Sequence, residues 1–165
     1  MENKVAKKAI ETIDMLQLIS VSSIKGFDLT PFLYKAIILK EKDFRDALKG
    51  HDFREFQESK VYIHCSSDAI IPMWAYMLVA SYLTDMGIPH IFAQNKAEAI
   101  NVFISEAISV MDVKPYANKR VIVKGCGGKI SVKEQNYVKL TQKLKPVVRA
   151  ISYGEACSMV PISKN

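Results

Sequence analysis

The sequence contains only three cysteines, and they lie far apart along its 165 residues. An odd number of scattered cysteines argues against a disulfide framework and favours thiols or metal ligands in a reducing compartment. Long hydrophobic runs are also missing: the longest, from Met73 to Leu83, is well short of the roughly 20 residues that span a membrane. The N-terminus has no apolar signal-peptide core. We therefore expect a cytoplasmic protein with no membrane contact.

Acidic residues are scarce in one part of the chain. Between Lys114 and Arg149, ten Lys or Arg accompany a single acid, Glu134, whereas the remainder has 13 bases and 16 acids. Such a basic third can meet nucleic acid, an acidic protein or a phosphorylated ligand. Its bases are spread along a strand, a loop and a helix, which favours a solvated face and makes nucleic acid an unfavoured partner. A binding module for an acidic partner stays open as one function.

No internal repeat, low-complexity tract or flexible linker divides the chain, so we predict a single domain over residues 1–165. With 49% apolar residues, the chain can form a core without disulfides. Residues 1–58 have the least regular pattern, with a strand at 10–15, a loop at 20–26 and helices beginning at Asp28 and Lys40. We expect this irregular and helical segment to pack on an α/β core formed by residues 60–165.

Strand and helix patterns alternate from residue 60 onward. β-branched and aromatic residues predict the strands, and apolar residues at three- and four-residue steps predict the helices. The expected strands are 61–65, 88–93, 120–124 and 147–153, and the expected helices are 71–87, 95–111 and 131–145. A helix between consecutive strands makes those strands parallel neighbours, and parallel sheets are covered on both faces. We therefore predict an α/β fold with a mostly parallel sheet and helices on both faces, in three layers.

Capping signals mark the ends of these helices. Pro72 lies in the first turn of one helix and Gly87 lies just past its end. Asn95 with Glu98, and Ser131 with Glu134, have the spacing of a capping box. The first of these helices is apolar almost all round, so we expect it to be largely buried.

The three cysteines lie at or just after the carboxyl ends of predicted strands. Ligands bind at this edge of an open parallel sheet, so Cys65, Cys126 and Cys157 form a candidate site. Three thiolates, with His64 or Asp68, would suit zinc or an iron–sulfur cluster, although the paired C-x-x-C spacing is missing. The alternative for each cysteine is an ordinary small hydrophobic residue of the core.

A small-molecule enzyme with a crevice at the same edge is a second hypothesis. Its candidate catalytic residues are Cys126, Lys124 and Glu155. Gly125, Gly127 and Gly128 surround Cys126 and are candidate cofactor-binding residues, because glycines let a ligand approach the backbone. The full spacing of a phosphate-binding loop is absent, and a hairpin-like loop is the alternative.

Four stretches carry a resemblance to a known family. They are Leu39–Arg45, Cys65–Met77, Val123–Gly127 and Tyr153–Ile162. Together they resemble the domain-of-unknown-function family 2480 (DUF2480), found chiefly in Bacteroidetes-type bacteria. Ala156 stands where the family pattern has proline, and Gly128 stands where it has an acidic residue.

The resemblance implies a cellular role for the protein but no particular enzymatic activity. Genes of this family often neighbour Suf-type iron–sulfur assembly genes, which implies an accessory factor with iron–sulfur assembly proteins as partners. All three cysteines lie inside the stretches that carry the resemblance. An accessory factor, a small-molecule enzyme and a binding module therefore remain as three hypotheses, and a homodimer is compatible with each.

Overall fold

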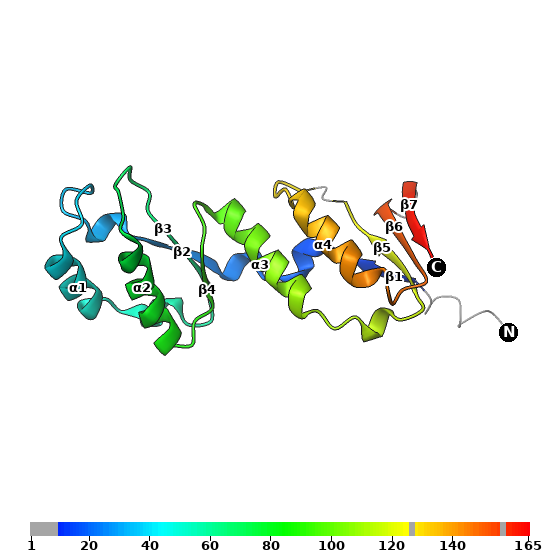
Figure 1. Ribbon diagram of the computed structural model, residues 1–165, viewed down its shortest axis with the longest axis horizontal. Coiled ribbons are helices and arrows are strands. Elements are labelled where there is room, and N and C mark those ends of the chain that lie inside the picture. The colour runs from blue at the N-terminus through cyan, green and yellow to red at the C-terminus, as the bar shows by residue number, and fades with distance from the viewer. Residues whose placement is uncertain (1–9, 126–127, 156–157) are drawn as a thin grey trace. The chain divides into compact units, whose positions relative to one another are not determined.

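The computed structural model describes residues 10–125, 128–155 and 158–165. Contacts between Cα atoms divide the chain into two compact units. We call residues 21–102 the central unit, and residues 1–20 together with 103–165 the terminal unit. Each unit contains one β-sheet (Figure 1).

The central unit is built on three parallel strands in the order β2-β3-β4. The strands are β2 (Ile24–Asp28), β3 (Lys60–His64) and β4 (His90–Phe92). Its helices are α1 (Glu41–Gly50) and α2 (Met73–Asp85), with short 3-10 helices η3 (Val21–Ser23), η4 (Thr30–Phe32) and η5 (Phe53–Phe56). Figure 1 shows α1 and α2 beside this sheet.

Aromatic side chains dominate the core of the central unit. Phe27 of β2 stacks on Phe32 and Phe53, with ring centroids 5.3 and 5.5 Å apart. Phe44 of α1 is fully buried and meets the Trp74 ring edge-on. These rings pack with Val61 and Ile63 of β3 and with the apolar face of α2, so one face of the sheet is covered by both helices.

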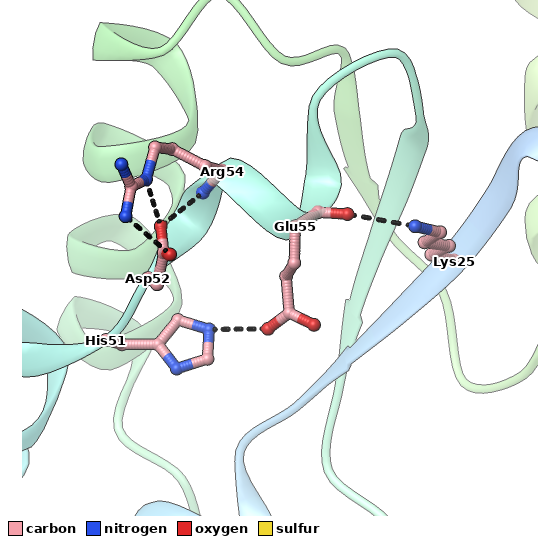
Figure 2. Close-up of polar contacts among 5 residues, drawn as sticks. All are labelled: Lys25, His51, Asp52, Arg54 and Glu55. Carbon is pink, nitrogen blue, oxygen red and sulfur yellow. Dashed lines mark hydrogen bonds and ion pairs between the residues drawn. The ribbon is translucent and has the colours of Figure 1, made fainter.

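Polar contacts fix the segment between α1 and β3 (Figure 2). Asp52 caps η5 by accepting from the Arg54 backbone, and its carboxylate also accepts two bonds from the Arg54 guanidinium. These bonds from Arg54 lower the pKa of Asp52 to about 2. Lys25 of β2 donates to the Glu55 carbonyl, at 2.9 Å. His51 Nε2 lies 3.2 Å from Glu55 Oε1, which is close enough for an ion pair, although the two atoms do not form a hydrogen bond.

The terminal unit is built on a four-stranded sheet in the order β1-β5-β6-β7. The strands are β1 (Ile10–Ile13), β5 (Arg120–Val123), β6 (Ala150–Glu155) and β7 (Ser158–Lys164). The first three are parallel, and β7 returns antiparallel to β6. The unit also holds α4 (Glu134–Leu144), η2 (Met15–Leu18) and η6 (Lys114–Tyr116), and the boundary between the units falls within α3 (Lys96–Val110).

On one side, the terminal sheet packs against the hydrophobic core of its unit. Val121, Val123 and Ile151 are buried and lie on the same face by their register. The terminal-unit part of α3 lies beside α4, because Lys139 of α4 donates to the Ser105 carbonyl and hydroxyl of α3 at 2.9 and 2.8 Å. Lys143, one turn further, donates to the Ser109 carbonyl.

The predicted α/β class with mostly parallel strands is confirmed. The units β3-α2-β4 and β5-α4-β6 are parallel crossovers, as the alternating pattern predicts. The strands nevertheless lie in two sheets where one was expected, because β4 and β5 do not pair. Within each unit, burial alternates along the strands, so one face of β3 and β5 is buried and the other is half-buried or exposed.

The N-terminal segment is more regular than expected. Residues 24–28, expected in part as a loop, form β2 along β3, while β1 pairs with β5. The first 58 residues therefore give one strand to each sheet. The single domain over residues 1–165, with residues 1–58 packed on a 60–165 core, stays a prediction.

The predicted end of α2 and the predicted start of α3 are correct, whereas Pro72 is the N-cap of α2 and does not lie in its first turn. Gly87 follows α2 with a φ of 67°, a conformation that glycine adopts without strain. Asn95 Oδ1 accepts from the Glu98 backbone at the start of α3, and Glu98 accepts from the Gln94 backbone. The predicted Ser131 cap is wrong, because α4 begins at Glu134 with Lys133 as its N-cap.

Two further details differ from the sequence prediction. The α2 helix is only partly buried, since Met73 and Met77 are 71% and 70% exposed. Strand β7 was missed because Pro161 argues against a strand; it lies in an edge strand, beside the irregularity at Ile151/Ser152. None of the helices in the described ranges has the length and apolar character to cross a membrane. The cytoplasmic location stays a prediction.

We predict that Phe44→Ala lowers the free energy of unfolding by about 3–5 kcal/mol, because it removes a buried ring from the central core. Phe92→Ala is the matched control, since Phe92 is 57% exposed in the same unit, and it should cost about 1 kcal/mol or less. Urea denaturation of both variants measures the difference. Equal losses would contradict the assignment of Phe44 to the core.

Candidate functional site

Cys65 lies directly after β3, at the carboxyl edge of the central sheet. It is a free cysteine of intermediate exposure, and it packs against the aromatic core. Its Sγ lies 3.6 Å from the Ser67 carbonyl, to which it donates, 3.3 Å from Ser67 Oγ and 3.5 Å from Thr30 Oγ1. Three oxygen atoms therefore surround the thiol, and the one assigned hydrogen bond uses its proton.

Asp28, at the end of β2, organises the loop that follows Cys65. Its Oδ1 accepts from the backbones of Thr30 and Ser66, both at 3.0 Å, and its Oδ2 accepts from Ser66 Oγ at 2.5 Å. Thr30 Oγ1 accepts in turn from the backbones of Ser66 and Ser67. Partial burial acts to raise the pKa of Asp28, but the hydrogen bonds from Ser66 and Thr30 outweigh it and hold the pKa at about 2.

The predicted co-ligands are not brought to Cys65. His64 lies over Gly26 and stacks on Tyr62, with ring centroids 5.0 Å apart. Successive strand residues point to opposite faces, so His64 and the core-facing Cys65 diverge. Asp68 is exposed. In the ranges 10–125, 128–155 and 158–165, no three His, Cys, Asp or Glu side chains form a group that could hold a metal ion.

The other two cysteines, Cys126 and Cys157, lie outside the described residues, as does Gly127. Their positions in the sequence fall within the terminal unit, whereas Cys65 belongs to the central unit. The convergence of the three cysteines on one metal site therefore stays a prediction.

A crevice of about 700 Å³ opens in the terminal unit, with Gly128 in its lining. One wall comes from Val123, Ile151 and Tyr153 of the sheet, and the opposite wall comes from α4. We call it the α4 crevice. Its lining comprises Val123, Gly128, Ile130, Ser131, Val132, Glu134, Tyr137, Val138, Thr141, Ile151, Ser152, Tyr153 and Ile162.

The surface of the α4 crevice is mostly apolar, with six aliphatic side chains, two aromatic rings and a few polar groups among the described lining residues. The rings of Tyr137 and Tyr153 meet edge-on, with centroids 5.7 Å apart and planes at 80°. Glu134 is the one carboxylate among the described residues of the lining. The Thr141 hydroxyl donates to the Tyr137 carbonyl, one turn back along α4. The arrangement suits an apolar molecule that carries one or two polar groups.

The predicted glycines relate to this crevice in different ways. Gly128 lines it. A Cβ on Gly125 would lie 2.8 Å from Tyr153 Oη, so glycine at this position lets the Tyr153 ring pack close to the loop. Neither predicted catalytic side chain, Lys124 or Glu155, is part of the lining.

Sequence reasoning missed the wall that α4 contributes. Thr141 lies four residues after Tyr137 and three after Val138, the spacing of neighbours on one helix face, and this was the available signal. It did not identify a crevice, because apolar residues at that spacing usually pack against the sheet.

Several lysines between Lys114 and Arg149 form hydrogen bonds or ion pairs with other groups of the terminal unit. Lys139 and Lys143 donate to carbonyls of α3. Lys119 pairs with Glu11 at 2.6 Å, and Lys145 bonds to the Asn165 side chain. Of these four, only Lys119 has its charge paired with a carboxylate of a described residue; the other three are held by neutral acceptors, which fix their position and leave their charge in place.

Comparison with known proteins gives one match. The family model described as "Protein of unknown function (DUF2480)" matches residues 1–165, the whole chain, which confirms the resemblance. No curated protein and no solved structure matches the chain.

We predict that Asp28→Asn destabilises the protein at pH 5 and that this effect shrinks toward pH 2. The folded pKa of Asp28 is about 2, below the ordinary 3.8, so its carboxylate stabilises the fold above about pH 4. That contribution is lost as the pH falls through 2. We expect about 1 kcal/mol, because the site is partly open to solvent.

Urea denaturation at pH 5, 4, 3 and 2 measures this difference. Asp68→Asn, which alters an exposed carboxylate of the same loop region, is the control. A difference between the wild type and Asp28→Asn that stays constant with pH would disprove the role given to the Asp28 hydrogen bonds.

Proposed function

The chain belongs to the DUF2480 family of proteins of unknown function, and we propose that it binds a small organic molecule in the α4 crevice. The crevice itself is the observation that carries this proposal. Its volume of about 700 Å³ lies in the range of small-molecule and cofactor sites, about 300–1,000 Å³. It also lies beside the carboxyl end of β5, where parallel sheets bind ligands.

The lining restricts the chemistry of the ligand. Aliphatic side chains from β5, β6 and α4 would surround an apolar body, and the Tyr137 and Tyr153 rings would contact an aromatic or cyclic group. Glu134, in the first turn of α4, would accept a hydrogen bond from a ligand N–H or O–H. The ligand is therefore mostly apolar, with a donor group at one end.

The observations favour binding over catalysis. Lys124 and Glu155, the two predicted catalytic residues that the structure describes, lie outside the lining, and most of the lining is apolar. An enzymatic role for Cys126 stays a prediction, because that residue lies outside the described ranges.

We predict that Val138→Trp weakens ligand binding at least about tenfold, because a large ring at this position fills the mouth of the α4 crevice. Val138 is 57% exposed, so the variant should fold. Val110→Trp makes the same change at an exposed position of α3 outside the lining and serves as the control.

The measurement is a protein-observed NMR screen with a library of small aromatic and cyclic amines and alcohols. Hits should shift the amide signals of residues 128–141 in the wild type and in Val110→Trp, with much smaller shifts in Val138→Trp. A screen without hits, or hits that bind both Trp variants equally, would refute the proposal.

We also propose an accessory role in iron–sulfur assembly, with zinc or a cluster held by cysteine and with assembly proteins as partners. The observation that favours it is the free, half-buried thiol of Cys65 at the carboxyl edge of β3. The described residues do not complete a metal site around it, so the role depends on Cys126 and Cys157 as the further ligands.

Anaerobic purification followed by metal analysis and absorption spectroscopy tests this second proposal. We predict bound metal in the wild type and at least about tenfold less in the triple variant Cys65→Ser, Cys126→Ser, Cys157→Ser, because thiolates are the preferred ligands. Ser66→Ala controls for changes in the loop itself. A colourless, metal-free wild type whose triple variant supports cluster assembly normally would eliminate the role.

A further inference from the structure

On the face of the terminal sheet opposite its buried side chains, the described residues are exposed or half-buried. Register places Ile10, Arg120, Ala150 and Lys164 in one row across the four strands of this face. Ile10 is 48% exposed, and Arg120 and Lys164 are exposed. Parallel sheets are usually buried on both faces, so a bare face in such a sheet marks a surface without its partner.

The same face contains a groove of about 370 Å³, which we call the open-face groove. Its floor comes from β5 and β6, and its sides come from β1 and β7. The lining comprises Ile10, Arg120, Val121, Ile122, Arg149, Ala150, Ser152, Met159, Pro161, Ile162, Ser163 and Lys164. Aliphatic side chains form most of it, and no acidic residue is present among them.

The three cations of the open-face groove are available to a partner. Arg120, Arg149 and Lys164 form no ion pair with any described residue, in contrast to Lys119, which pairs with Glu11. The wider charge distribution has the same sign: the terminal unit has 14 bases and 7 acids, whereas the central unit has 9 bases and 10 acids. The groove thus combines an apolar floor with positive charge concentrated near one end of the strands.

We infer that the open-face groove docks an amphipathic helix of a partner protein, with acidic side chains beside its apolar stripe. A helix is the element that covers a sheet face in α/β domains, and its apolar stripe would lie on Ile10, Ile122 and Met159. Its acidic side chains would pair with Arg120, Arg149 and Lys164, and such complementarity sets the choice of partner.

Two other occupants fit the groove less well. A second copy of this chain, paired through the same face about a twofold axis, would bring two positively charged grooves together, and like charges oppose association. Nucleic acid would meet the cations, but the lining has no aromatic side chain on which a base could stack.

Two synthetic helical peptides with the same leucine stripe test this inference, one flanked by glutamates and the other by lysines. Binding to the full chain is measured by fluorescence anisotropy at low and moderate salt. We expect the acidic peptide to bind at least about tenfold more tightly than the basic one, and its affinity to fall as salt screens the charges.

The double variant Arg120→Glu, Lys164→Glu should reverse this preference in favour of the basic peptide. The variant Lys42→Glu, Lys49→Glu changes the net charge equally on exposed positions of α1 in the central unit, and it should keep the wild-type preference. Thermal unfolding verifies that each variant is folded. If the double variant does not fold, Lys164→Glu alone, in the exposed edge strand, should reduce the preference severalfold.

Four results would overturn the inference. These are no binding of either peptide, equal binding of both, unchanged preference in the groove variants, or tighter binding of a single-stranded oligonucleotide than of the acidic peptide. A wild-type dimer that Lys164→Glu converts to a monomer would assign the face to a second copy instead.

Discussion

The pairing of the first two strands with distant partners determines how the rest of the chain is arranged. β1 pairs with β5, about a hundred residues further along the chain, whereas β2, which follows β1 closely, pairs with β3. A strand can extend only the sheet to which its backbone is hydrogen-bonded, so these two pairings start two sheets. The crossovers through α2 and α4 then complete each sheet separately, since β4 and β5 do not pair.

Two sheets give two carboxyl edges, and this changes how the functional residues are grouped. Cys65 follows β3 at the edge of the central sheet, where Asp28 and Thr30 arrange the adjoining loop. The α4 crevice lies beside the carboxyl end of β5 in the terminal sheet. Within each unit, the parallel strands still bring their strand-end residues to one edge of the sheet, but two separate sheets do not by themselves bring the three cysteines together.

Structural features could be predicted from the sequence where the stabilising contacts come from residues a few positions away. The Asn95 cap and Gly87 are of this kind, because their hydrogen bond and backbone conformation involve residues a few positions away. Strand β2 could not be read in this way: Lys25 and Gly26 disfavour a strand, and pairing with β3 overrides that preference. A Cβ on Gly26 would lie 2.8 Å from the Tyr62 ring, so the glycine serves a contact across the sheet.

The candidate sites show the same difference between features that depend on local sequence and features that depend on long-range contacts. Cys65 and Gly128 could be predicted because strand ends and glycine-rich loops are visible locally, but the α4 wall of the crevice depends on how a helix lies against a sheet. The charged residues of the terminal unit also show what cannot be predicted from local sequence. Lys119, Lys139, Lys143 and Lys145 bind groups inside the terminal unit, whereas Arg120, Arg149 and Lys164 remain on its open face. A count of charges treats these two sets alike, and only the folded chain shows which cations have a partner within the unit.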